Sequence, residues 1–354
     1  MPFPSEAFWN SKRVLVTGHT GFKGAWLALY LSEIGANVRG MALQPKGTRN
    51  LFAELKLSET IERDSRVDIR DFERVRAEII DFQPEVVFHL AAQPLVSEGY
   101  RFPLETISTN VFGTSNLLEA TRQAGIECVF ISVATDKVYA NTKSGEAFIE
   151  SDPLGGYDPY SASKASADII SQMYFSAYFS EVGNGVGVAR AGNVIGGGDW
   201  SEDRLFPDLA RAWSSNRRLR MRFPSATRPW QHVLEPLRGY LLLAEKLHED
   251  PLKSGPMNFG PNAEDSVTVE EVVRIASDYW PNNPGWEIDT EVCFHESKDL
   301  AVDCGRAKNV LDFDAVWSSA TAIERTVEWY REFHSGTSAL ELCYRDIEHY
   351  ELAR

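Results

Sequence analysis

Cysteine, long apolar runs and positive charge are all scarce in this sequence, and each shortage excludes a class of protein. None of the cysteines has a C-x-x-C spacing, which favours free thiols in a reducing compartment; they are Cys128, Cys293, Cys304 and Cys343. No stretch approaches the roughly 20 apolar residues of a membrane span. The first ten residues, MPFPSEAFWN, lack the basic and apolar regions of a signal peptide. We therefore expect a cytoplasmic protein with no membrane contact.

The charge balance is acidic, with one local exception. The 36 lysines and arginines face 51 aspartates and glutamates, a formal net charge of −15 over 354 residues. Such a surface repels phosphate backbones, so we expect no nucleic-acid partner. The balance reverses between Arg204 and Arg228, where seven arginines accompany a single acid, Asp208. A local basic stretch on an acidic body suits a small anionic ligand.

The order of apolar segments predicts an α/β fold with a parallel sheet. Short β-branched runs alternate with helical patterns up to about residue 190, which is typical of repeated βαβ units. Strands are predicted at 13–17, 37–43, 84–90, 127–133 and 186–190, and helices at 26–34, 71–82, 104–124 and 159–179. Beyond residue 190 the alternation weakens, and we expect helices at 234–247, 267–279 and 323–333 and a short strand at 256–260.

A glycine-rich turn joins the first predicted strand to the first predicted helix. Gly18, Gly21 and Gly24 have the spacing G-x-x-G-x-x-G. The first glycine permits a tight turn, the second a close approach by a pyrophosphate, and the third close packing of the helix on the strand. The position between a strand and a helix favours a dinucleotide site over a plain tight turn.

The acidic residue that should follow about 20 residues later to bind the ribose is missing. The second predicted strand instead runs into Gly40-Met-Ala-Leu-Gln-Pro45. Lys46 and Arg49 lie just beyond, which leaves a 2′-phosphorylated cofactor open. Asp68 and Ile69 are candidates to contact the adenine, with a polar strand end or a helix cap as the alternative interpretation.

Tyr160-Ser-Ala-Ser-Lys164 places a phenol and an ammonium on one face if the segment is helical. We expect the ammonium to lower the pKa of Tyr160, so that a phenolate can take a proton from a sugar hydroxyl while hydride leaves the same carbon. The alternative is a solvent-facing pair. The strand ending at Thr135 and the string that begins at Arg190 make this alternative the weaker one.

Five longer strings carry a resemblance to a known family. They are TGHTGFKG (17–24), HLAAQ (89–93), YDPYSASK (157–164), RAGNVIGGGDW (190–200) and RPWQHVLEPL (228–237). Over nearly the whole chain the sequence resembles the extended short-chain dehydrogenase/reductase family, in particular its CDP-glucose 4,6-dehydratase branch. The resemblance implies NAD as cofactor and CDP-D-glucose as small-molecule substrate. The product would be CDP-4-dehydro-6-deoxy-D-glucose plus water, formed by an internal redox cycle in a homodimer whose long helices pair.

The same resemblance implies a domain layout and a set of cofactor contacts. We expect a Rossmann-type doubly wound parallel sheet that binds NAD over residues 1–192, with 231–260 returning to it. A smaller C-terminal α/β lobe over 193–230 and 261–354 would bind the nucleotide sugar. The expected cofactor contacts are Gly18, Thr20, Gly21, Phe22, Lys23, Gly24, Asp68, Ile69, Leu90, Ala91, Ala92, Gln93, Asn110, Tyr160 and Lys164.

Thr135-Asp136-Lys137 follows a predicted strand, at the end of the sheet where ligands bind in open α/β folds. Related dehydratases that act on thymidine nucleotides carry Thr-Asp-Glu here, so Lys137 is a departure. The resemblance makes Asp136 the acid that protonates the departing 6-hydroxyl and Thr135 a partner of the 4-hydroxyl. Lys137 is either the base, which requires a lowered lysine pKa, or a charged stabiliser of the enolate. A polar turn after a strand is the alternative interpretation.

Substrate contacts are expected at Thr135, Asn193, Arg204, Arg228 and His232, of which the two arginines align with family positions that face the diphosphate. Arg217, Arg218 and Arg220 fit a solvated face or an oligomer contact equally well, and His232 fits a buried core position as well as a ligand contact. The histidines show no metal-ligand spacing, so no metal is expected.

Two other interpretations of the function remain open. One is a 4-epimerase, reductase or other 4,6-dehydratase of the same fold, and the other is a non-enzymatic dinucleotide sensor, which the Thr135, Tyr160 and Lys164 set disfavours.

Overall fold

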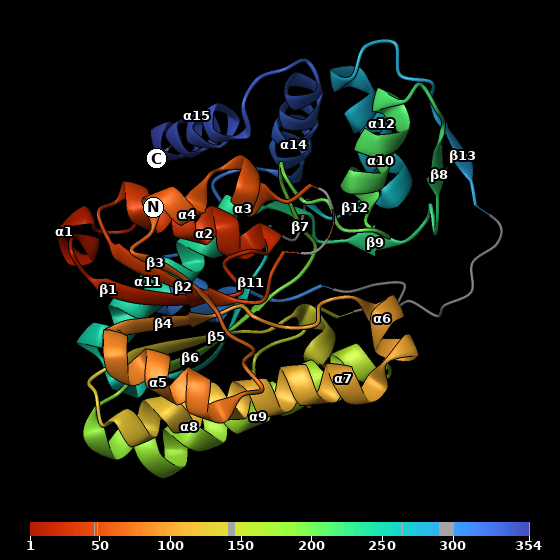
Figure 1. The fold of residues 1–354 in the computed structure, drawn as a ribbon. Coiled ribbons are helices and arrows are strands. Elements are labelled where there is room, and N and C mark those ends of the chain that lie inside the picture. The colour runs from red at the N-terminus through yellow and green to blue at the C-terminus, as the bar shows by residue number, and fades with distance from the viewer. Residues whose placement is uncertain (46, 48, 141–145, 263–264, 290–300, 354) are drawn as a thin grey trace.

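A seven-stranded parallel sheet forms the centre of the protein in its computed structural model, which describes residues 1–45, 47, 49–140, 146–262, 265–289 and 301–353 (Figure 1). The strand order is β11-β6-β5-β4-β1-β2-β3, and every neighbouring pair is parallel. The strands are β1 (Arg13–Thr17), β2 (Asn37–Ala42), β3 (Arg63–Arg66), β4 (Val86–His89), β5 (Val129–Val133), β6 (Val186–Ala191) and β11 (Gly255–Phe259). Because the order reverses direction at β1, this is the doubly wound Rossmann-type sheet that the sequence predicts.

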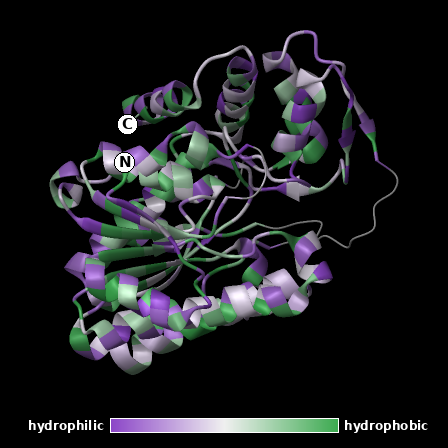
Figure 2. Ribbon diagram, viewed as in Figure 1, coloured by the Kyte–Doolittle hydropathy of each residue, from purple (hydrophilic) through white to green (hydrophobic). Residues whose placement is uncertain are grey.

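The central strands form because both of their faces are buried, as continuous apolar runs require in a parallel sheet. In β1, Val14 and Val16 face one core while Leu15 faces the other, as alternation along a strand dictates. Figure 2 shows the hydrophobic residues concentrated in these strands. The edge strand β3 was not among the predicted strands because its sequence, Arg-Asp-Ser-Arg, has no apolar residue to signal it.

Helices cover both faces of the sheet (Figure 1). On one face α5 packs against α8, which lies beside α9. On the other face α2 and α11 share one apolar core. These helices are α2 (Phe22–Glu33), α5 (Phe72–Phe82), α8 (Gly113–Ala124), α9 (Pro159–Tyr174) and α11 (Leu234–Glu249). All five fall in segments predicted to be helical.

The two long predicted helices are confirmed, and each contains one π turn. The first runs from α7 (Pro103–Ile107) through a π turn at Ser108–Phe112 into α8, and it ends where Gly125 takes φ +61°. The second runs from α9 into a π turn at Phe175–Phe179. The π turn of the first helix places Asn110 against the loop after β4, as described below.

Most of the residues after β6 build a second layer at the carboxyl end of the sheet, whereas α11 and β11 belong to the sheet layer and α13 (Gly305–Leu311) packs against both. Three two-stranded ladders of the second layer pair β7 (Val194–Ile195) with β10 (Gln231–His232), β8 (Leu219–Met221) with β13 (Trp286–Ile288), and β9 (Thr227–Arg228) with β12 (Val267–Thr268). The helices of this layer are α10 (Leu205–Ser214), α12 (Val269–Tyr279), α14 (Ser319–His334) and α15 (Ala339–Leu352). α15 lies against α3, which belongs to the sheet layer.

The remaining short helices are α1 (Glu6–Trp9), α3 (Leu51–Glu54), α4 (Leu57–Thr60), α6 (Val96–Arg101) and three 3₁₀ turns at Asp136–Val138, Ser180–Val182 and Pro251–Lys253. Among the described residues, no helix has both the length and the apolar character needed to cross a bilayer. Cys128, Cys304 and Cys343 form no disulfide, and Cys293 lies outside the described residues.

Candidate active site

Two of the three glycines around the turn between β1 and α2 have no room for a side chain. Gly18 has φ +76°, and a Cβ built on it would lie 2.7 Å from the backbone nitrogen of Ala91. A Cβ on Gly24 would lie 2.2 Å from the carbonyl oxygen of Gly18. Gly21 is the residue before α2, so the free backbone N–H groups of the first helical turn begin here. The loop therefore fits a pyrophosphate at the helix N-terminus.

The loop after β4 forms the opposite wall of this cradle. The backbone N–H of Gln93 donates to Asn110 Oδ1 at 2.8 Å, and Asn110 Nδ2 donates to Ser163 Oγ at 2.8 Å. Leu90, Ala91 and Ala92 lead into this contact from the end of β4. The structure thus brings together the cofactor candidates that follow β1 and β4 with Asn110 from the π turn.

The two residues expected to contact the adenine, Asp68 and Ile69, lie in different environments. The Asp68 carboxylate pairs with Arg70 at 2.6 Å, and this guanidinium lowers the pKa of Asp68. Ile69 is buried against Gly113 of α8. The guanidinium of Arg49 lies 5.5 Å from the ring centre of Trp200, in the second layer. Lys46 lies outside the described residues.

Tyr160 and Lys164 lie in the first turns of α9, which Asp158 caps by accepting the N–H of Ser161. Lys164 Nζ donates to the carbonyl oxygen of Val133 at 2.6 Å, and burial lowers the pKa of this ammonium to about 8. Burial raises the pKa of Tyr160 to about 12, although a hydrogen bond with Thr135 opposes the rise. Burial therefore dominates the pKa of Tyr160 in the chain alone, and the expectation that the charge of Lys164 favours the phenolate stays a prediction.

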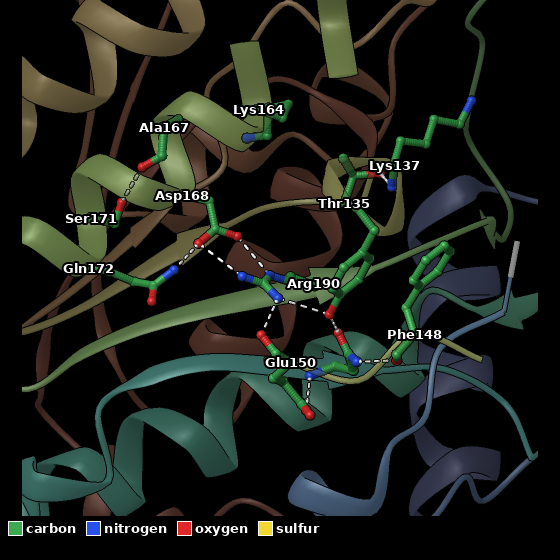
Figure 3. Close-up of polar contacts among 12 residues, drawn as sticks. Thr135, Lys137, Phe148, Glu150, Lys164, Ala167, Asp168, Ser171, Gln172 and Arg190 are labelled. Carbon is green, nitrogen blue, oxygen red and sulfur yellow. Dashed lines mark hydrogen bonds and ion pairs between the residues drawn. The ribbon is translucent and has the colours of Figure 1, made fainter. Parts of the chain in front are cut away.

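The Thr135-Asp136-Lys137 trio forms a tight 3₁₀ turn directly after β5. Thr135 Oγ1 donates to Asp136 Oδ1 at 3.0 Å and caps the turn by accepting the N–H of Lys137 at 3.4 Å. Asp136 is buried, and among the described residues its Oδ2 has no hydrogen-bond partner. Figure 3 shows the Lys137 side chain extended beside Thr135. An oxygen without a partner on a buried carboxyl group is available to a bound ligand, to which it can pass a proton when the group is protonated.

One pocket unites these groups at the carboxyl end of the sheet. It is lined by residues of the glycine loop, the 3₁₀ turn, α9 and the second layer; they include Lys23, Thr135, Asp136, Lys137, Tyr160, Asn193, Arg204 and Arg228. Asn193 stands in a left-handed backbone conformation, φ +42°, at the end of β6. A strained non-glycine residue that opens onto a pocket is typical of a functional position.

His232 is the predicted substrate contact that the pocket does not include. Its ring is fully buried, 4.9 Å from the ring of Trp317 and 5.8 Å from that of Trp26. Burial lowers its pKa to about 3. Of the two interpretations left open for His232, its position matches the core one.

The arginine-rich segment carries less free charge than its sequence suggests. Arg204 pairs with Asp199 at 3.0 Å, Arg222 with Asp203 at 3.1 Å and Arg220 with Asp289 at 3.0 Å; Arg211 likewise pairs with Asp208. Three of these four aspartates lie outside the 204–228 segment and were not singled out from the sequence. Asp199 belongs to the 190–200 string that carries the family resemblance, but its ion pair with Arg204 depends on the fold and cannot be read from the sequence.

Lys23 is a further group whose environment the sequence does not reveal. Its Nζ lies 3.5 Å from the hydroxyl of Tyr240, and burial lowers its pKa to about 7, with the charges of Arg204 and Lys164 adding to the effect. In the described part of the chain, no three His, Cys, Asp or Glu side chains are grouped as metal ligands.

Comparisons with known proteins agree with this geometry. The GDP-mannose 4,6 dehydratase family model matches residues 15–338. A CDP-glucose 4,6-dehydratase of Salmonella typhimurium is 43% identical over 350 residues, covering 97% of each chain. A bovine dTDP-D-glucose 4,6-dehydratase is 28% identical and covers 95% of this chain and 93% of its own.

Solved structures share the fold. The protein MoeE5 in complex with UDP-glucose and NAD superposes with a TM-score of 0.77 at 25% identity, over 91% of this chain and 99% of that one. The UDP-glucose 4-epimerase of Thermus thermophilus in complex with NAD gives a TM-score of 0.75 at 24% identity, over 90% of this chain and 99% of that one.

Proposed function

The chain belongs to the GDP-mannose 4,6 dehydratase family, and from this premise we propose that it is an NAD-dependent hydro-lyase that converts CDP-D-glucose to CDP-4-dehydro-6-deoxy-D-glucose and water. The observation that carries the proposal is a juxtaposition. The Asp136–Lys137 pair and the Tyr160–Lys164 pair line or flank one pocket beside the glycine cradle. A sugar held there can meet a redox centre and an acid–base pair without moving.

NAD is the cofactor, and the glycine cradle fits its pyrophosphate because Gly21 stands at the N-terminus of α2, where backbone N–H groups of the first helical turn can bind an anion. When bound, NAD would supply an acceptor for the hydride of C4 and a donor of the same hydride to C6. The residues Gly18 to Gly24 and Leu90 to Gln93 would hold it, with Asn110 fixing the second loop. A positively charged nicotinamide near Tyr160 would oppose the burial that raises the pKa of this tyrosine.

The first half of the reaction is assigned to α9 and Thr135. Tyr160, as phenolate, takes the proton of the 4-hydroxyl, and Thr135 orients that hydroxyl through its bond to the phenol. Lys164 stays next to the carbonyl of Val133 and favours the phenolate by its charge. The C4–H bond breaks in this step and C4 becomes a ketone.

The second half is assigned to the 3₁₀ turn. The new ketone acidifies the C5 proton, which Lys137 removes if it is a neutral amine. If Lys137 instead stays charged and stabilises the enolate, the carboxylate of Asp136 takes the C5 proton before it acts as the acid. Asp136 donates a proton to the 6-hydroxyl, the C6–O bond breaks and water leaves a C5–C6 double bond. The orphaned Oδ2 of Asp136 supports this role, because it carries no bond that the proton transfer would have to break.

The nucleotide end is assigned to the second layer. We propose that residues 193–230 and 261–354 form the nucleotide-sugar lobe, with Asn193, Arg204 and Arg228 around the diphosphate and the sheet of residues 1–192, joined by 231–260, holding NAD. Arg204 remains half exposed despite its pair with Asp199, so its guanidinium has donors left for phosphate oxygens. The cytidine preference is supported by the Salmonella typhimurium relative.

A homodimer and a cytoplasmic location complete the proposal. Large apolar side chains stand exposed along the first long helix and α9: Leu104, Ile107, Phe112, Ile169 and Met173. Such a stripe on two neighbouring helices fits pairing with the same helices of a second copy. The three described thiols, free of disulfides, fit a reducing compartment.

The test is to incubate the purified protein and NAD with CDP-, dTDP-, GDP- and UDP-hexoses and to follow nucleotide sugars by mass spectrometry. CDP-glucose should yield a product lighter by one water. Water loss from only a non-cytidine nucleotide would overturn the substrate assignment, and epimerisation without water loss would favour the 4-epimerase alternative.

A further inference from the structure

Arg190 makes four hydrogen bonds to three parts of the chain, behind the active site (Figure 3). Its side chain is 1% exposed. Nε and Nη2 donate to the two oxygens of Asp168 at 2.7 and 3.2 Å. Nη1 donates to the hydroxyl of Tyr139 at 2.9 Å and to the carbonyl of Glu150 at 3.1 Å. Neither Arg190 nor Asp168 nor Tyr139 lines the pocket, so none of them is placed to touch the substrate.

The first arm of this network holds α9. Tyr160, Lys164 and Asp168 are spaced four residues apart, so they follow one another along one face of the helix. Asp168 is fully buried and fastens that face to β6 through both oxygens. Gln172, one turn further, donates to Asp168 at 2.6 Å and fixes its rotamer. Through these bonds Arg190 restrains both the rotation of α9 about its axis and its position along β6.

The second arm holds the 3₁₀ turn. Tyr139 is the residue at which the turn Asp136–Val138 ends. Its hydroxyl accepts from Arg190 and donates to Asn258 Oδ1 at 2.6 Å. Its ring is stacked on Phe148, with centres 4.8 Å apart and planes 3° from parallel. The C-terminal end of the 3₁₀ turn is thus hydrogen-bonded to the same guanidinium that holds α9.

We propose that Arg190 is a positioning residue that sets the spacing between the two catalytic pairs: α9, with Tyr160 and Lys164, through Asp168, and the turn with Asp136 and Lys137 through Tyr139. The inference rests on the proposed function. The two pairs act on adjacent carbons of one sugar, and an error of about 1 Å in such a placement can cost about 10²-fold in rate. A planar guanidinium with fixed donor directions is suited to hold two arms in one geometry.

The arms can be separated by Tyr139→Phe, which keeps the stacked ring and both bonds between Arg190 and Asp168. Proton removal at the 4-hydroxyl should continue, while water loss slows about five- to tenfold or more, because the variant loses the two buried hydrogen bonds that the hydroxyl of Tyr139 makes with Arg190 and Asn258. Rapidly quenched samples should then contain a 4-keto sugar nucleotide that has not lost water. Mass spectrometry distinguishes the two, because this ketone is two hydrogens lighter than the substrate and one oxygen atom heavier than the final product. A purely structural role would slow both steps together.

Asp168→Asn perturbs the other arm and should give the opposite pattern, with slow formation of the ketone and no build-up of the undehydrated species. Tyr30→Phe is the matched control, because it also removes a buried tyrosine hydroxyl, one bonded to Glu351 far from the turn. The control should change neither step.

Equal loss of both steps in Tyr139→Phe, no change in either step, or ketone build-up in Asp168→Asn would overturn the inference. These outcomes differ from failure of the proposed function. In that case the unmodified protein would form no ketone and lose no water from any nucleotide hexose.

Discussion

Gly192 is the position where a single methyl group should displace Asp136, the proposed catalytic acid. Gly192 follows β6, and a Cβ built on it would lie 1.9 Å from Asp136 Oδ2 and 2.4 Å from its Cγ. Ordinary van der Waals contact begins near 3.4 Å. In Gly192→Ala the carboxylate must therefore retreat by about 1.5 Å, which would also break its hydrogen bond from Thr135.

The size of the effect follows from that displacement. Misplacing a reacting group by about 1 Å costs on the order of 10²-fold in rate, so Gly192→Ala should lower kcat for water loss by about 10²-fold or more. Overpacking of this kind costs about 1–3 kcal/mol of stability, which is small beside a typical total of about 5–15 kcal/mol. The variant should therefore remain folded and keep binding NAD.

A double-mutant cycle gives the assay. The unfolding free energy is measured for the unmodified protein, Gly192→Ala, Asp136→Ala and the double variant. Asp136→Ala removes the group that clashes, so Gly192→Ala should cost about 1–3 kcal/mol alone and close to nothing in that background. Gly260→Ala is the control, since its Cβ would meet only the side chains of Val302 and Cys304, at 3.1 and 3.5 Å. Equal costs in both backgrounds, or full kcat in Gly192→Ala, would refute the reasoning.

Three further predictions follow from other parts of the structure. Lys137→Met should abolish water loss while calorimetry still shows NAD binding, because Lys137 lines the pocket beside Thr135 and Asp136 and is not among the expected cofactor contacts. Full dehydratase turnover would contradict its role. Burial lowers the pKa values of His89 and His232 to about 3. The unfolded chain therefore takes up protons below about pH 6.5 that the folded chain does not, and stability should fall as the pH drops. Urea unfolding at about pH 7.5 and pH 5 checks this, and equal stability at both would argue against it. Phe112→Glu should convert the proposed dimer to a monomer in sedimentation experiments, since it buries a charge in the apolar stripe; an unchanged dimer would move the interface elsewhere.

The sheet was predictable where burial dictates sequence. β1, β4 and β5 are continuous apolar runs because helices cover both their faces, and such runs can be read without a structure. β3 lies at the sheet edge, where charged residues suffice. The helices α10 and α15 were not among the predicted helices, although α11, α12 and α14 in the same part of the chain were.

The residues of the candidate site could be proposed from the sequence, but their pKa values and ion pairs could not. The glycine spacing and the Tyr160–Lys164 spacing are local patterns that survive in any fold with this topology. The pKa of Tyr160 depends on burial, and the net charge of the arginine segment depends on partners such as Asp289 and Asp203 that only folding brings near. The same holds for Gly192 and Arg190, whose importance comes from distances across the sheet.

The most direct test of internal hydride transfer is to supply CDP-glucose deuterated at C4 and to locate the label in the product by nuclear magnetic resonance. The account predicts a CDP-4-dehydro-6-deoxyglucose with deuterium at C6, transferred within one sugar, so that a mixture with unlabelled substrate shows no crossover. Deuterium that returns to C4, or is lost to solvent, would contradict it.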